Sequence, residues 1–133
     1  MGVAVAADRT LFTSGQPRTQ QAFLSPNQGS WETVAESAAV SGGEVMRFSG
    51  PGTVGFVAEE NGLLQAVSGI CSHQGCLLEF NAGARRLDCP CHRAAFSLAG
   101  KVLFSELSVP PPPLTRLAVR RQGSEVQVYL PST

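Results

Sequence analysis

The sequence predicts an all-β fold, an antiparallel β sandwich of short strands. Glycine and proline are frequent, with 14 and 9 residues in a chain of 133, and such a composition favours short strands and many turns over long helices. Two apolar stretches are interrupted by Asn61-Gly62 and by Gly123, each at a position suited to a hairpin turn. No basic block, acidic tail or membrane-length apolar run is present, so we expect no nucleic-acid partner and no span within this sequence.

The first part of the chain carries little structural signal. Residues 1–30 are rich in Gln, Ser, Thr and Pro, and we interpret them as an N-terminal arm or linker. A single β domain is then expected over residues 31–133. Its opening stretch, WETVAESAAV from Trp31, is compatible with either a strand or a short helical turn.

Two hairpins define the β domain. The stretch TVGFVAEENGLLQAV centres on Asn61-Gly62, and this dipeptide suits the positive backbone angles of a type I′ turn. The stretch LAVRRQGSEVQVYL predicts a second hairpin around Gly123. In its second strand, alternate residues are expected to face the core: Val126, Val128 and Leu130, with Gln127 and Tyr129 on the other side. Further turns are predicted at SGGE (residues 41–44) and at AGK (residues 99–101).

All four cysteines and both histidines lie between residues 71 and 92, in the stretches CSHQGC and CPCH. Scattered core residues would not gather in this way, so the pattern indicates a metal site. Predicted strand pairs flank the window at residues 63–70 and 96–104. Each ligand group therefore lies on a loop at a strand end, where a rigid sheet can present chemistry.

Two metal sites compete for these residues. Zinc accepts two thiolates and two imidazoles in tetrahedral geometry, but zinc-finger histidines usually come together after the cysteines. Here the first loop offers Cys71 with His73, and the second offers Cys89 or Cys91 with His92. A two-iron cluster with cysteines on one iron and histidines on the other can use this interleaving. One cysteine is left over in each loop, and a disulfide between them would tie the loops together.

The two boxes, C-x-H-x-G-C and C-P-C-H separated by twelve residues, resemble those of the Rieske iron–sulfur proteins. The resemblance is close over about residues 69–96, and it implies a cluster-binding subdomain over about residues 69–113. The implied cofactor is a 2Fe-2S cluster. The implied ligands are Cys71 and Cys89 on one iron and His73 and His92 on the other.

The resemblance also implies a disulfide between Cys76 and Cys91, which marks the quinol-oxidising type. The stretch SVPPPPL (residues 108–114) matches the position of the proline loop that covers the cluster in this family. Consecutive prolines fix an extended backbone, so such a segment can shield a site without flexing. We expect Pro111 of this segment to lie near the cluster.

The sequence departs from the quinol-oxidising pattern around the cluster. Those members commonly follow CPCH with Gly-Ser and, after one more residue, Tyr, where this chain has Arg93, Ala94 and Phe96. Ala94 and Phe96 cannot donate the hydroxyl hydrogen bonds that stabilise a reduced cluster. We therefore predict a potential well below the top of the Rieske range, which is roughly −150 to +300 mV. Gln74 stands where quinone-linked members often carry Leu, and it makes the tip more polar.

The resemblance implies one-electron transfer rather than catalysis by this chain alone. We expect the soluble or extrinsic part of a quinol-oxidising respiratory complex, with a cytochrome of b or c type as redox partner and quinol as electron source. The alternative is a soluble ferredoxin that supplies an oxygenase or another oxidoreductase. A disulfide indicates the periplasm or the extracytoplasmic face of a membrane, whereas a ferredoxin would be cytoplasmic. Membrane contact would come from a removed anchor or a partner subunit.

Overall fold

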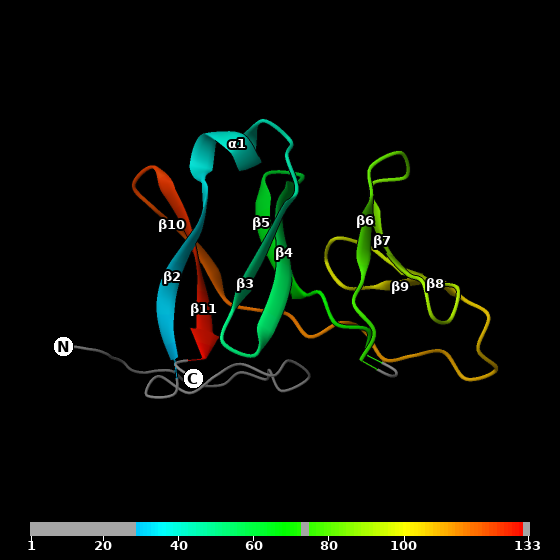
Figure 1. The fold of residues 1–133 in the computed structure, drawn as a ribbon. Coiled ribbons are helices and arrows are strands. Elements are labelled where there is room, and N and C mark those ends of the chain that lie inside the picture. Colours follow the sequence, from blue (N-terminus) through cyan, green and yellow to red (C-terminus); the bar gives the residue numbers. More distant parts are fainter. Residues whose placement is uncertain (1–28, 73–74, 132–133) are drawn as a thin grey trace, which may run out of the picture.

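A computed structural model describes residues 29–72 and 75–131, and its strands form three antiparallel sheets (Figure 1). In spatial order, the first sheet contains β10 (Val119–Gln122), β11 (Glu125–Pro131) and β2 (Gly29–Glu36). The second contains β3 (Met46–Gly50), β4 (Thr53–Glu60) and β5 (Leu63–Ser68). The third contains β6 (Glu79–Asn81), β7 (Arg86–Cys89), β8 (Ala94–Phe96) and β9 (Val102–Ser105). The all-β prediction is confirmed.

The opening stretch from Trp31 forms both of the structures that its sequence allowed. Strand β2 runs to Glu36, and the short helix α1 (Ser37–Ser41) follows directly. The helix ends where Gly43 adopts a φ of 101°, in the left-handed region that glycine enters without a steric penalty. Residues 1–28, which make up most of the predicted arm, lie outside the described residues, and β2 begins at Gly29.

Both predicted hairpins are present. Asn61 and Gly62 join β4 to β5 with φ values of 55° and 81°, as a type I′ turn requires. Gly123, with a φ of 64°, lies in the turn between β10 and β11. Along β11 the predicted alternation holds, and three residues are buried: Val126, Val128 and Leu130.

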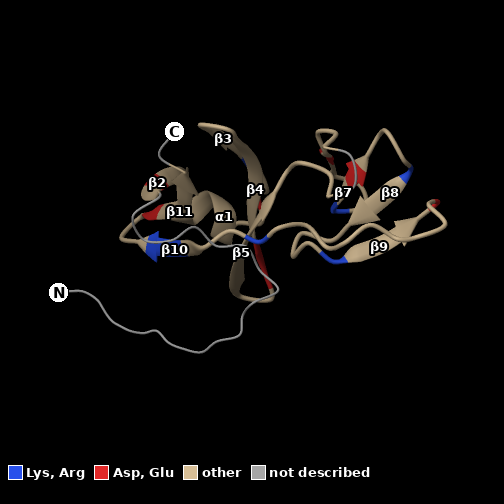
Figure 2. Ribbon diagram, turned by 90° about the horizontal axis from the view of Figure 1, so that it is seen from below, with Lys and Arg blue, Asp and Glu red and all other residues tan. Residues whose placement is uncertain are grey.

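The second sheet separates two hydrophobic cores. Side chains alternate across a strand, so Phe56 and Ala58 of β4 enter the core shared with the third sheet. Val57, between them, enters the core shared with the first sheet. This double burial explains the nearly continuous apolar run in β4. Figure 1 shows the third sheet lying beside the other two, and Figure 2 shows that both signs of charge are spread over the molecule.

The third sheet contains a hairpin that no local sequence pattern predicts. Strands β6 and β7 lie between the two cysteine-bearing stretches and pair Phe80 with Leu87. Their short sequence, with a turn over residues 82–85, lacks a strong hairpin dipeptide. Among the described residues, no helix is long and apolar enough to cross a bilayer.

Candidate metal centre

The first cysteine-bearing loop is closed at its base by backbone hydrogen bonds. The N–H of Cys71 donates to the carbonyl of Cys76 at 2.7 Å, and the N–H of Gly75 donates to the carbonyl of Cys71 at 3.0 Å. Just outside this pair, Ile70 bridges Leu77. The chain therefore returns on itself between Cys71 and Cys76. His73 and Gln74 lie outside the described residues, so their predicted roles stay predictions.

The second loop is the tight turn between β7 and β8. Cys89 is the last residue of β7, and it pairs directly with Ala94, the first residue of β8. The turn closes at Arg93, whose φ of 51° lies in the left-handed region. This local geometry places Cys91 and His92 outside the sheet while Cys89 remains in the core.

Two thiols meet between the loops. Cys71 and Cys89 are both unoxidised and buried, with 3 % and 2 % of their surface exposed. Burial raises the pKa of the Cys89 thiol, and the neighbouring Cys71 side chain raises it further. The backbone N–H groups of Cys91 and His92 act in the opposite direction, because they donate to the Cys89 sulfur and favour its thiolate. An apolar pocket with two such donors suits a thiolate bound to a cation.

The other two cysteines form a disulfide. It joins Cys76 to Cys91, fifteen residues apart in the sequence, and so ties the first loop to the second. Its two sulfurs lie within 4.8 Å of the Cys89 sulfur. A disulfide sulfur is not a thiolate, so this group of three is not itself a metal site. Cys71 and Cys89 are the two cysteines that keep a free thiol.

The second loop also carries a histidine, three residues after Cys89. The Nε2 atom of His92 is buried, although the residue as a whole is only half-buried. Two buried thiols and an imidazole nitrogen provide the mixed sulfur and nitrogen donors that a Rieske cluster uses. The described part of the chain therefore fits such a cluster.

The proline segment lies against the first loop. The hydroxyl of Ser72 donates a hydrogen bond of 2.5 Å to the carbonyl of Pro112. Pro111 is buried, and the N–H of Leu114 anchors the end of the segment on the carbonyl of Gly100 at 2.9 Å. No sequence pattern pointed to Ser72, because its partner is forty residues away and no local motif links them.

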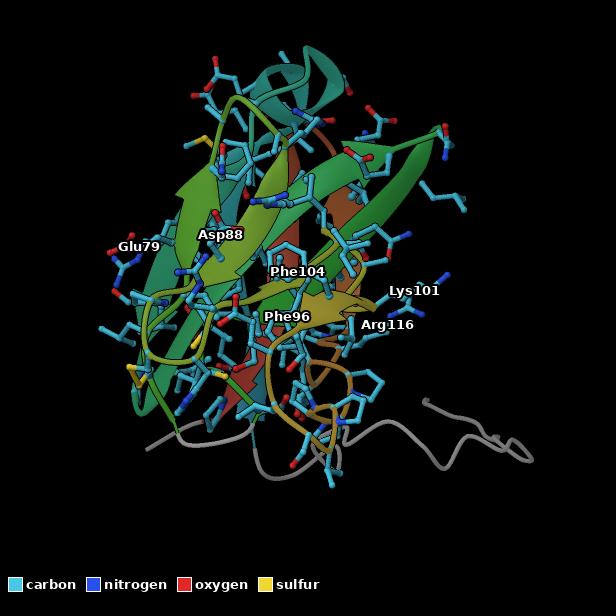
Figure 3. The ribbon with its side chains drawn as sticks, turned by 90° about the vertical axis from the view of Figure 1, so that its right-hand side faces the viewer. Glu79, Asp88, Phe96, Lys101, Phe104 and Arg116 are labelled. Atoms are coloured by element: carbon cyan, nitrogen blue, oxygen red, sulfur yellow. A yellow bond between two sulfur atoms is a disulfide. The ribbon has the colours of Figure 1, made fainter. Side chains whose placement is uncertain are left out.

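The three residues after His92 differ in their surroundings. Arg93 is exposed, and it forms an ion pair of 3.0 Å with Glu106. Ala94 and Phe96 are buried, with 2 % and 0 % exposed, and they share the face of the third sheet that carries Cys89. The opposite face carries Asp88 and Phe104, both labelled in Figure 3.

An antiparallel β scaffold that brings two cysteine-bearing loops together through a disulfide, with two thiols buried between them, defines a Rieske iron–sulfur domain. Residues 30–114 match the Rieske 2Fe-2S domain family, so the chain belongs to that family. The cofactor of this family is a 2Fe-2S cluster.

Curated relatives include iron-sulfur subunits of cytochrome b6-f complexes. The chain is 36 % identical over 76 residues to the cytochrome b6-f complex iron-sulfur subunit of Chlorobaculum tepidum, covering 56 % of this chain and 40 % of that protein. It is 32 % identical over 95 residues to the same subunit of Chlorobaculum thiosulfatiphilum, covering 71 % and 50 %. The chain therefore spans about half the length of the curated relatives that it matches.

Solved structures show the same fold. The cyanobacterial plasma membrane Rieske protein of Synechocystis superimposes with a TM-score of 0.60 at 26 % identity, covering 73 % of this chain and 97 % of that one. The ferredoxin of carbazole 1,9a-dioxygenase from Nocardioides aromaticivorans gives a TM-score of 0.54 at 24 % identity, covering 74 % and 95 %. The second likeness concerns the fold alone.

Proposed function

We propose that Cys71, His73, Cys89 and His92 hold the cluster, and that the chain is the extrinsic electron-transfer part of a quinol-oxidising complex. The observation that carries this proposal is the Cys76–Cys91 disulfide, which lies directly beside Cys89. It locks together the two loops that bear the proposed ligands. A loop closure of this length contributes about 3 kcal/mol of stability in the chain-entropy model.

The protein prepares the ligands before the cluster binds. A buried thiol with a raised pKa resists ionisation, and a cationic iron reverses that preference. Once the thiolate forms, the N–H groups of Cys91 and His92 stabilise its negative charge. When bound, the cluster supplies one electron at a time. The surrounding apolar side chains, such as Leu78 and Leu114, exclude water from the sulfur side of the site.

The surroundings support a potential below the top of the Rieske range. Ala94 and Phe96 occupy buried positions on the cluster-bearing face, and neither has a hydroxyl group to donate. The positive charge of Arg93 works in the other direction, but Arg93 is 76 % exposed and is paired with Glu106. Solvent and the neighbouring carboxylate screen that charge, so the missing donors dominate.

The proposed electron source is a quinol and the proposed partners are cytochromes of b or c type, by analogy with the cytochrome b6-f iron-sulfur subunits. The disulfide supports a location on the extracytoplasmic side of a membrane or in the periplasm. A low potential suits a low-potential quinone. It also suits the alternative function, a soluble ferredoxin that supplies an oxygenase. We propose a domain over residues 31–133, with the cluster-binding part over about residues 69–113.

Anaerobic reconstitution with iron and sulfide tests the ligands. The wild-type protein should gain visible absorption and the paramagnetic resonance of a reduced mixed-ligand cluster. Cys71→Ser, Cys89→Ser, His73→Ala and His92→Ala should each abolish that signal, while Glu79→Gln on the same sheet should keep it. A wild-type spectrum in the double variant of both histidines would contradict the assignment.

The physiological partner needs a separate measurement. Stopped-flow reduction of the loaded protein by a quinol should be fast for an extrinsic subunit when a cytochrome b complex that lacks its own iron–sulfur subunit is present. Reduction by a flavin-dependent ferredoxin reductase should be slow. The reverse order would favour the oxygenase-linked alternative.

A further inference from the structure

We propose that residues 106–114, here called the proline strap, are pinned to both ligand loops by two side-chain contacts, and that these contacts set how long the protein retains its cluster. One contact joins Ser72 to Pro112, and the other joins Arg93 to Glu106. The inference rests on the proposed function, because it concerns a cluster held by these loops.

The strap cannot hold itself in place through a sheet. Its four consecutive prolines have no N–H group to donate, so this stretch cannot enter a regular ladder. A proline can still accept a hydrogen bond through its carbonyl oxygen. The Pro112 carbonyl accepts a hydrogen bond from the Ser72 hydroxyl. Ser72 lies directly after Cys71, so this hydrogen bond joins the strap to the first ligand loop.

The second contact secures the point where the strap leaves the third sheet. The pair Ala94 and Ser105 is the end of the β8–β9 ladder. The next residues outward, Arg93 and Glu106, continue this register as an ion pair of 3.0 Å. Arg93 follows His92, so the pair joins the start of the strap to the second ligand loop.

Together the two contacts hold the strap across the gap between the loops. Between them, Pro111 is buried, and beyond them Leu114 packs into the core that contains Cys71 and Cys89. A chelator or solvent molecule approaching from this side must displace the strap. The two contacts differ in kind: the hydroxyl hydrogen bond is insensitive to salt, while the exposed ion pair is screened by it.

The test is the rate at which the loaded protein loses its visible absorption to a chelator, at low salt and at about 1 M NaCl, where charges are screened beyond about 3 Å. Ser72→Ala should accelerate loss about three- to tenfold at both salt concentrations. Glu106→Gln should accelerate loss about twofold at low salt only. High salt should accelerate the wild type to the rate of Glu106→Gln, and the double variant should show the product of the two effects. Glu79→Gln, a matched exposed glutamate on the same sheet, should behave as the wild type.

Hydrogen exchange of the loaded protein provides the second measurement. The Leu114 amide, which donates to Gly100, should exchange faster in both strap variants, while β11 amides keep the wild-type rate. If Ser72→Ala and Glu106→Gln both show the cluster spectrum and lose the cluster at the wild-type rate, that result would overturn the proposed role of the strap contacts and leave the proposed function intact. Failure of the wild-type protein to take up any cluster would overturn both. If Ser72→Ala fails to fold, the ionic contact can still be tested alone. Cluster loss should then depend on salt in the wild type and not in Glu106→Gln, and the same salt dependence in both proteins would overturn that contact.

Discussion

Cys89 and Ala94 face each other directly across β7 and β8, at the position where the second ligand loop leaves the sheet. Side chains in such a pair have Cβ atoms about 4.5–5.5 Å apart, and both residues are buried in the same core. The Ala94 methyl group therefore stands beside the sulfur that we propose as an iron ligand. A hydroxyl at this position could reach that sulfur, and alanine leaves the sulfur without it.

We predict that Ala94→Ser raises the reduction potential by tens of mV. The hydroxyl would donate to the more negative, reduced cluster, and hydrogen bonds to charged groups contribute about 1.5–3 kcal/mol, of which only the difference between oxidation states counts. A redox titration followed by visible absorption measures the change. The matched control is Ala95→Ser, which is equally buried but lies on the opposite face beside Asp88. Equal shifts in both variants would refute a direct effect.

The replacement of both Cys76 and Cys91 by serine should destabilise the protein. The disulfide closes a loop of about fifteen residues, which corresponds to about 3 kcal/mol in the chain-entropy model. Urea unfolding of the cluster-free protein should show this loss, and chemical reduction of the wild type should reproduce it. The loaded double-serine variant should also release its cluster faster, because no covalent bond then links the two ligand loops directly. Unchanged unfolding midpoints would mean that the disulfide does not constrain the chain as we describe.

Much of this architecture follows from local sequence patterns, and the remainder depends on tertiary contacts. Asn61-Gly62 requires a turn whatever surrounds it, and the cysteine and histidine residues identify a metal site by type and spacing. The β6–β7 hairpin was missed because its strands are only three and four residues long. Packing of Phe80 and Leu87 against the core stabilises them, and a single strand pair would not be stable alone.

Contacts between distant segments were likewise invisible in the sequence. The hydrogen bond from Ser72 and the ion pair of Glu106 depend on how the third sheet folds back on the ligand loops. Neither residue belongs to a motif of its own. The effect of Arg93, by contrast, could be anticipated in sign but not in size, because its exposure and its partner became known only from the structure.

We expect Arg93 to strain the backbone of the second ligand loop and, through its ion pair with Glu106, to slow the loss of the cluster. Its φ of 51° disfavours any residue with a Cβ atom by about 1–2 kcal/mol. Arg93→Gly and Arg93→Ala both remove the ion pair with Glu106, but only glycine relieves the backbone. We predict that the glycine variant is about 1 kcal/mol more stable than the alanine variant in urea unfolding of the cluster-free protein. Both should lose the cluster to a chelator at the faster rate of Glu106→Gln. Equal stabilities would show that the turn relaxes around the alanine.

Arg85 joins the third sheet to the second. From the β6–β7 turn its guanidinium contacts Glu60 at the end of β4, at 2.8 and 2.9 Å, and the carbonyl of Gly43 at 2.8 Å. The contact is partly exposed, so its contribution to stability is about 1 kcal/mol or less. We predict that Arg85→Ala lowers the free energy of unfolding by about this amount.

Arg85→Lys should restore less than half of this loss, because a lysine cannot contact the carboxylate and the carbonyl with a planar fork. The exchanged pair Arg85→Glu with Glu60→Arg tests whether charge alone suffices. It should recover the contact with the carboxylate but not that with Gly43, so its stability should lie between those of the alanine variant and the wild type. Full recovery would show that the carbonyl contributes nothing.

Hydrogen exchange of Arg85→Ala should show which part of the fold loses stability. Faster exchange confined to β6 and β7 would indicate that Arg85 anchors the hairpin that ends in Cys89. A uniform change across all three sheets would contradict that role.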